Sequence, residues 1–115
     1  MKYDMADIKL DKGSTALLIA DFYADVMGSI AHAVGRNCIE KTLALREAAR
    51  KAGLLICYSA TVFRSGYPEI GGRNKIFVPR KRAGKPAVSD PLALIHPALR
   101  PADGEIVIGK HRVNA

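Results

Sequence analysis

The chain has 115 residues, of which 49% are hydrophobic and 25% charged, and its formal net charge is +7. This size suits one domain, and this balance of apolar and charged residues excludes an intrinsically disordered chain. No apolar run reaches the roughly 18 residues of a membrane-spanning helix, and the N-terminus lacks the apolar core of a signal peptide. Two cysteines, Cys38 and Cys57, are too few for a disulfide scaffold. We therefore expect a cytoplasmic protein with no membrane partner.

The positive charge is concentrated in the second half of the chain. Residues 59–115 carry ten Lys and Arg against four Asp and Glu, whereas residues 1–58 carry eight against seven. Six of the ten basic residues lie between positions 73 and 85. Such a segment is either a solvated loop or a surface that attracts anions. Phe77 is its only aromatic residue and no nucleic-acid-binding motif is present, so we expect no nucleic-acid partner.

The first predicted element is a strand within residues 14–20, which is continuously apolar from Ala16 to Ala20. A short run without polar alternation is typical of a strand buried on both faces of a parallel sheet. Residues 22–36 then fit a short helix that Gly28 interrupts and Gly35 ends.

A longer helix is predicted over residues 38–52. Asn37 and Glu40 resemble a capping box at its start, and Gly53 provides a left-handed stop at its end. Glu47 and Lys51 have the spacing of a helical ion pair. Small and apolar side chains recur at helical spacing and predict the buried face: Cys38, Leu45, Ala48, Ala49 and Ala52.

Two further strands are predicted over residues 54–60 and 105–109. The strand–helix–strand order across residues 14–60 favours parallel pairing with a right-handed crossover. About 44 residues separate the last two strands, rich in Gly, Pro and basic side chains, with one helical turn expected near residues 92–95. Connections of that length are usually functional. We expect a single α/β domain over residues 1–115.

A carboxylate and an ammonium stand at the ends of two of these strands. Asp21 directly follows the first strand, and Lys110 directly follows the third. Sites in open α/β sheets form beyond the carboxyl ends of the strands, so the two groups are predicted to meet at one edge. The alternative is that Asp21 caps a turn while the Lys110 side chain lies along the surface.

Several segments resemble the isochorismatase-like cysteine hydrolases, in family order and over nearly the whole chain. Residues 15–25 are similar to the family's opening strand, which runs into Asp-x-Gln-x-Asp. The other similar segments are the first helix and its stop (46–53), a variable loop (64–69, with Asn74), and the approach to the third strand with its lysine motif (95–101 and 105–115).

The resemblance implies a three-layer α/β/α Rossmann-like fold, of which this chain holds three strands. It also implies a catalytic triad in which Asp21 and Lys110 act with a cysteine. A nearby ammonium lowers the pKa of a thiol, and a carboxylate accepts the thiol proton and returns it later. Family substrates are small amides, carbamoyl compounds or the vinyl ether of isochorismate. Tyr23, at the family's Gln position, and Arg64, in the variable loop, are the predicted substrate-binding residues.

No metal or other cofactor is expected. The metal-binding nicotinamidase branch carries an Asp-x-His pair after the second strand, where this chain reads Ala60-Thr61-Val62. His32, His96 and His111 share no ligand spacing and are interpreted as surface or packing residues.

The cysteine of the triad is not expected among the two that the chain contains. The family nucleophile lies well beyond the lysine, at a later helix. Cys57 falls inside a strand, where it would be a small core residue. Cys38 opens a helix, whose N-terminus lowers a thiol pKa, but it also begins the apolar stripe. We expect a domain truncated before its nucleophile and inactive alone; the alternative is a non-catalytic binding or assembly module.

The family's strand order, third–second–first, places the first strand at an open edge. An exposed apolar edge favours pairing with other chains. Either the chain continues past Ala115 or another chain covers this strand, and we expect a homo-oligomer. The expected ligand is a small molecule, and the basic segment would favour an anionic one.

Overall fold

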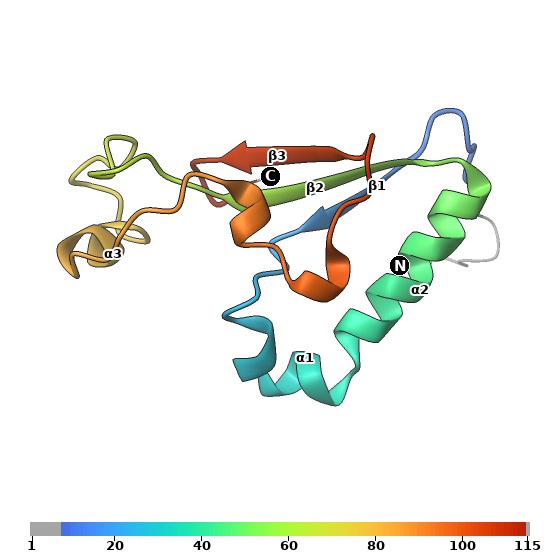
Figure 1. Ribbon diagram of the computed structural model, residues 1–115, viewed down its shortest axis with the longest axis horizontal. Coiled ribbons are helices and arrows are strands. Elements are labelled where there is room, and N and C mark those ends of the chain that lie inside the picture. The colour runs from blue at the N-terminus through green and yellow to red at the C-terminus, as the bar shows by residue number, and fades with distance from the viewer. Residues whose placement is uncertain (1–7, 115) are drawn as a thin grey trace.

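A three-stranded parallel sheet forms the centre of the computed structural model, which describes residues 8–114. Its strands are β1 (Ala16–Ala20), β2 (Leu55–Thr61) and β3 (Ile106–Lys110), in the order β1-β2-β3 (Figure 1). The predicted α/β class, the parallel pairing and the edge position of the first strand are confirmed. The second and third strands begin and end one residue later than predicted, so Lys110 is the last residue of β3 and not the first residue after it.

The helices are α1 (Ala31–Gly35), α2 (Cys38–Ala52) and α3 (Val78–Arg82), with 3-10 turns η2 (Met27–Ser29), η3 (Pro91–Ala93) and η4 (Pro97–Leu99). The predicted bounds of α2 are confirmed. The ambiguous region 22–36 forms two short elements, η2 and α1, instead of one helix. The basic segment 73–85, interpreted as either a solvated loop or an anion-attracting surface, contains α3, which lies beyond the end of the sheet to which the strand arrowheads point (Figure 1).

The two ends of α2 differ in how well the sequence predicts them. Gly53 has a φ of 76° and closes the helix in the left-handed conformation, as expected. The capping box was wrong, because the Asn37 side chain makes no capping hydrogen bond and its φ is 53°. Asn37 instead forms the left-handed turn between α1 and α2, a conformation that asparagine tolerates better than most residues.

The buried face of α2 matches the predicted stripe only in part: Ala49 is buried as expected, but Leu45 and Ala48 are exposed. Ile39, Leu43 and Ala49 pack on the core, whereas Leu45 is 55% exposed. Arg46 completes the buried face at 7% exposure. Its guanidinium donates to Tyr58 Oη and to the Arg100 carbonyl, both at 3.3 Å. A pattern that counts arginine as polar therefore misplaces the face, because the stem of this side chain is apolar.

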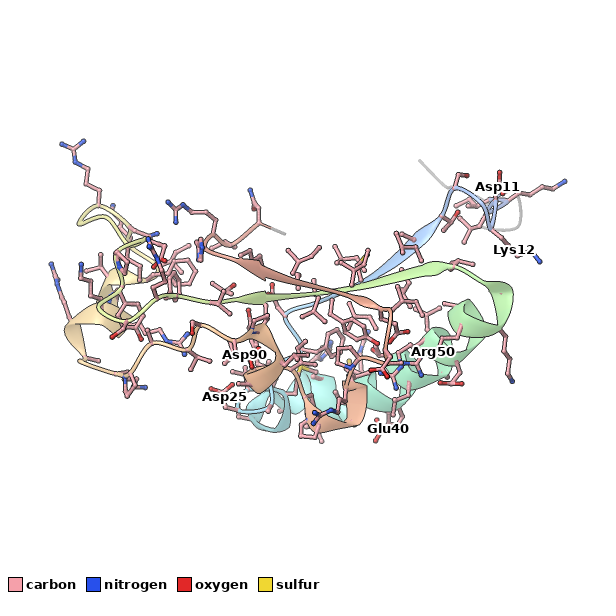
Figure 2. All side chains as sticks on the ribbon, turned by 45° about the horizontal axis from the view of Figure 1, so that its top comes forward. Asp11, Lys12, Asp25, Glu40, Arg50 and Asp90 are labelled. Carbon is pink, nitrogen blue, oxygen red and sulfur yellow. The ribbon has the colours of Figure 1, made fainter. Side chains whose placement is uncertain are left out.

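The core lies on one face of the sheet, between the strands and α2. Ile19, Ile56 and Tyr58 face inward from the strands and pack with Ala49 and Leu99. Every helix that packs against the sheet in the described chain lies on this side (Figure 2).

The opposite face of the sheet is exposed within residues 8–114. It carries Leu18, Leu55, Ile106 and Ile108, whose exposed fractions range from 42% to 52%. The prediction that the strands are buried on both faces was therefore wrong for the described residues. The strands carry apolar side chains on both faces, but no helix among the described residues packs against this second face.

A polar network joins α2 to the residue that precedes β3. Glu105 accepts from Arg50 Nε at 2.9 Å and Nη2 at 2.8 Å, and from the Tyr58 hydroxyl at 2.8 Å. Its carboxylate is only 11% exposed, and Figure 2 shows Arg50 beside the chain that leads into β3. The Arg50 hydrogen bonds, against an opposing effect of burial, hold the pKa of Glu105 at about 2. The predicted pair of Glu47 with Lys51 is replaced by one of Glu47 with Arg50 at 2.9 Å.

The Glu105 network predicts a specific acid sensitivity. Because the carboxyl pKa is lower in the folded state than its ordinary 4.5, its contribution is present above pH 4.5 and is lost as the pH falls toward 2. We expect the free energy of unfolding to drop by about 3 kcal/mol over that range. Glu105→Gln should lose that stability already at pH 7 and flatten the pH dependence in urea unfolding.

The matched control is Glu47→Gln, because Glu47 pairs with the same Arg50 but its side chain is 56% exposed. That variant should cost no more than about 1 kcal/mol. Equal acid sensitivity in wild type and Glu105→Gln would contradict this account.

Gly109 allows β3 to pass close to the end of β2. A Cβ built at this position would lie 2.8 Å from Val62 Cγ2, and Val62 is buried. Gly109→Ala should therefore destabilise the fold by about 1–3 kcal/mol, measured by denaturant unfolding. Gly71→Ala is the control, because a Cβ there meets open space and the backbone φ is not positive. Equal stability of the two variants would show that β3 shifts without cost.

Candidate active site

A cavity of about 290 Å³ lies at the carboxyl ends of the strands. Residues from β2, from the segments that follow β1 and β3, and from the basic segment all contribute to it. Its lining consists of Asp21, Tyr23, Asp25, Val26, Thr61, Ile76, Phe77, Arg80, Leu94 and Val113.

Asp21 leaves β1 with an unusual backbone conformation. Its φ is 63°, in the left-handed region, and its N–H donates to the Ser59 carbonyl at 3.0 Å, which continues the β1–β2 pairing. Aspartate and asparagine occupy this region more readily than most residues. The turn directs the chain out of the sheet and leaves the carboxylate 42% exposed at the cavity wall.

Lys110 reaches the same carboxylate from the end of β3. Its Nζ donates to Asp21 Oδ2 at 3.2 Å and to the Val113 carbonyl at 2.7 Å. The lysine side chain is only 9% exposed, against 42% for Asp21. The parallel topology thus brings together two groups that are 89 residues apart in sequence. The Lys110 side chain is largely buried, whereas the Asp21 carboxylate is open to the cavity.

Tyr23 lines the cavity, with its hydroxyl between the ends of β1 and β2. The phenol oxygen lies 2.7 Å from Asp21 Oδ1, 3.0 Å from Thr61 Oγ1 and 2.9 Å from the Thr61 backbone nitrogen. Burial raises the pKa of Tyr23, the hydrogen bonds from Thr61 lower it, and the Asp21 carboxylate raises it; the net effect is a rise. Tyr23 lines the cavity, and its hydroxyl is hydrogen-bonded to Asp21 and Thr61.

Arg64, the other predicted substrate-binding residue, is not among the residues that line the cavity. Its Nε donates to Glu69 Oε1 at 2.7 Å, and this bond lowers the pKa of Glu69. The cavity instead contains Arg80 from α3. Ile76 and Phe77, in the turn that leads into α3, line the cavity together with Arg80. The sequence interpretation included Arg80 in a basic segment that could attract anions, but it did not single this residue out because it predicted no helix there.

Two sets of contacts fix the basic segment beside the cavity. Asn74 Oδ1 accepts from the N–H groups of Ile76 and Phe77, both at 3.1 Å, and starts the helical turn. The Phe77 ring packs edge-on against Phe63, with centroids 5.0 Å apart, in a second apolar cluster with Tyr67 and Ile70. This packing places Arg80 at the cavity wall.

Thr61 is another lining residue that the sequence interpretation did not single out. It is the last residue of β2, at the same edge as Asp21 and Lys110. The signal was available, since a polar residue ends each of the three strands or directly follows it.

Neither cysteine lines the cavity. Cys38 is the first residue of α2 and is half-buried. Cys57 pairs in register with Leu18 and Ile106, on the exposed sheet face, and is also half-buried. The prediction of a core position for Cys57 was therefore wrong, because the helices cover the other face.

Within residues 8–114, no group of three His, Cys, Asp or Glu side chains is placed to hold a metal ion. His111 Nδ1 lies 2.7 Å from the Val62 carbonyl, and His96 Nδ1 accepts from the Ala98 N–H. Over the same residues, every helix is too short or too polar to cross a membrane.

Comparison with known families gives one match. The isochorismatase domain model matches residues 15–115, a span that includes Asp21, Tyr23 and Lys110. Comparison with curated proteins found no significant match. With the parallel sheet, the family match over most of the chain leads to one conclusion: this protein belongs to the isochorismatase domain family.

Proposed function

We propose that the protein is an isochorismatase-like hydrolase that acts on a small amide, or on a related C–N or C–O bond, through Asp21, Lys110 and a cysteine thiol. The observation that supports this most is the Asp21–Lys110 pair, with 3.2 Å between Oδ2 and Nζ at the wall of a cavity. Cys38 and Cys57, the two cysteines of the 115 residues, do not line that cavity, so the proposed nucleophile is a cysteine outside this sequence.

The proposed chemistry follows from the charges of the pair. Asp21 takes the proton of the cysteine thiol, and the thiolate attacks the carbonyl carbon of the substrate. The protonated Asp21 then gives that proton to the leaving amine as the C–N bond breaks. Water, deprotonated by Asp21, hydrolyses the thioester and regenerates the thiol. The Lys110 ammonium stabilises the anionic forms of the thiol and of the tetrahedral intermediate.

The cavity also favours a class of substrate. Ile76, Phe77 and Leu94 give it an apolar wall that fits a small ring or alkyl group, and Arg80 provides a guanidinium beside that wall. We therefore propose a substrate whose apolar body carries an anionic group directed toward Arg80.

The triad assignment predicts loss of hydrolysis in two variants. Hydrolysis of small amides is measured with the longest natural protein that contains these 115 residues. Asp21→Asn should lower kcat by about 10²- to 10⁴-fold, because the proton acceptor is lost while the left-handed backbone is tolerated. Lys110→Met should lower it similarly. Lys51→Met, in the last turn of α2 and exposed, is the control and should keep activity. Retained activity in either site variant would remove that residue from the mechanism.

The role of Arg80 is tested by binding, which does not need the nucleophile. Benzoate and benzamide share a ring and differ in charge, so NMR titration of the chain with both isolates the anionic group. Arg80→Gln should weaken benzoate binding about 10-fold and leave benzamide binding unchanged. Arg82→Gln is the matched control, because Arg82 is on the same helix but does not line the cavity. Equal effects of the two variants would indicate a general charge effect.

A second candidate function is a binding or assembly module derived from the hydrolase fold. The observation that favours it is the absence of both Cys38 and Cys57 from the cavity lining. The two functions differ in one result, since a binding module binds the ligand in this cavity and never releases product. We further propose a cytoplasmic homo-oligomer without nucleic-acid or membrane partners, with the exposed face of Leu18 and Ile108 as the reason for association.

A further inference from the structure

The phenol of Tyr23 has three hydrogen-bonding neighbours and no capacity for a fourth. A phenol donates one hydrogen bond and accepts two. The carboxylate of Asp21 can only accept, so the single phenol proton is directed to Asp21 Oδ1 at 2.7 Å. The Thr61 backbone N–H donates at 2.9 Å, and the Thr61 hydroxyl, 3.0 Å away, is left to donate as the second.

The two oxygens of Asp21 are therefore in different environments. Oδ1 accepts from Tyr23, and Oδ2 faces the Lys110 ammonium at 3.2 Å. The phenol contact to Oδ1 is the shorter of the two. A carboxylate held in this way cannot rotate to exchange its oxygens without breaking both contacts.

The backbone also holds Tyr23 in place. The residue forms an isolated antiparallel bridge with Ile95, in which the Ala24 N–H donates to Leu94 and the His96 N–H donates to Phe22, at 2.9 and 2.8 Å. Thr61, at the end of β2, fixes the other side of the phenol. The hydroxyl of Tyr23 is thus held by hydrogen bonds at the ends of β1 and β2, and its backbone is held by the bridge to Ile95.

We propose that Tyr23 is a positioning residue for Asp21: with Thr61 it occupies Oδ1 and leaves Oδ2, beside Lys110, as the oxygen that takes and returns the proton. This inference rests on the proposed function, in which that proton comes from the cysteine thiol and goes to the leaving amine. It revises the expectation that Tyr23 binds substrate, since Asp21 and Thr61 take up the hydrogen-bonding capacity of its hydroxyl.

The titration of Tyr23 reports on this arrangement. Its pKa is raised by burial and by the Asp21 carboxylate, and lowered by the Thr61 hydrogen bonds. Asp21, Asp25 and Arg80 line the same cavity as the phenol, and Lys110 contacts Asp21. Replacing Asp21 should therefore lower the Tyr23 pKa, and replacing Thr61 should raise it.

The experiment follows the tyrosine ring carbons of the chain by ¹³C NMR from neutral to alkaline pH, with Tyr23→Phe to assign the signal. In Asp21→Asn the Tyr23 pKa should fall toward its ordinary 10.0, because the anion that opposes ionisation is gone. In Thr61→Val it should rise further, because a donor to the phenolate is gone. Tyr58, whose raised pKa has other causes, is the internal control and should not move.

A Tyr23 titration that is unchanged in Asp21→Asn would overturn the proposal, and so would shifts of the same sign in both variants. Thr61→Ser guards against misfolding, since it keeps the hydroxyl and should restore the wild-type value. A second measurement uses the hydrolytic form of the protein, in which Tyr23→Phe should lower kcat about 10-fold with little change in KM. Opposite titration shifts without any wild-type hydrolysis would support the positioning of Asp21 and reject the proposed function.

Discussion

The ion pair between Asp21 and Lys110 is the constraint on which the rest of the site depends. Two side chains 89 residues apart meet at 3.2 Å only if β1 and β3 run parallel and end at the same edge. The left-handed turn at Asp21 and the close approach at Gly109 both serve that meeting, because one exposes the carboxylate and the other lets β3 reach its position. The Lys110 side chain is buried while the Asp21 side chain is exposed, so the group of the pair that can accept a proton, the Asp21 carboxylate, is the one open to the cavity.

Two separate packing units support this edge. The main core beneath the sheet, with the Glu105–Arg50 network, fixes where β3 begins, and therefore where Lys110 ends it. The smaller aromatic cluster around Phe63 fixes the basic segment, and therefore Arg80. The Asp21–Lys110 pair and the proposed anion-binding residue Arg80 thus depend on different parts of the fold.

Much of this architecture was predictable from the sequence, for physical reasons. Short apolar runs predicted the strands, the strand–helix–strand succession predicted their parallel pairing, and the strand ends predicted the position of Asp21 and Lys110. The features that were not predicted depend on side chains that can take either of two structural roles. Arg46 packs its stem and donates from its tip, so polarity alone misplaced the face of α2. Asparagine is common both as a helix cap and in left-handed turns, and Asn37 adopts the turn because α1 ends immediately before α2 begins. Arg80 and Thr61 became site residues only through tertiary packing.

The most direct measurement is a crystal structure of the longest natural protein containing this chain, with an aldehyde analogue of a small amide bound. The account predicts a covalent adduct in the cavity, its cysteine sulfur close to Lys110 and within hydrogen-bonding reach of Asp21 Oδ2. An adduct on a cysteine remote from this pair, or an analogue bound at another surface, would contradict it.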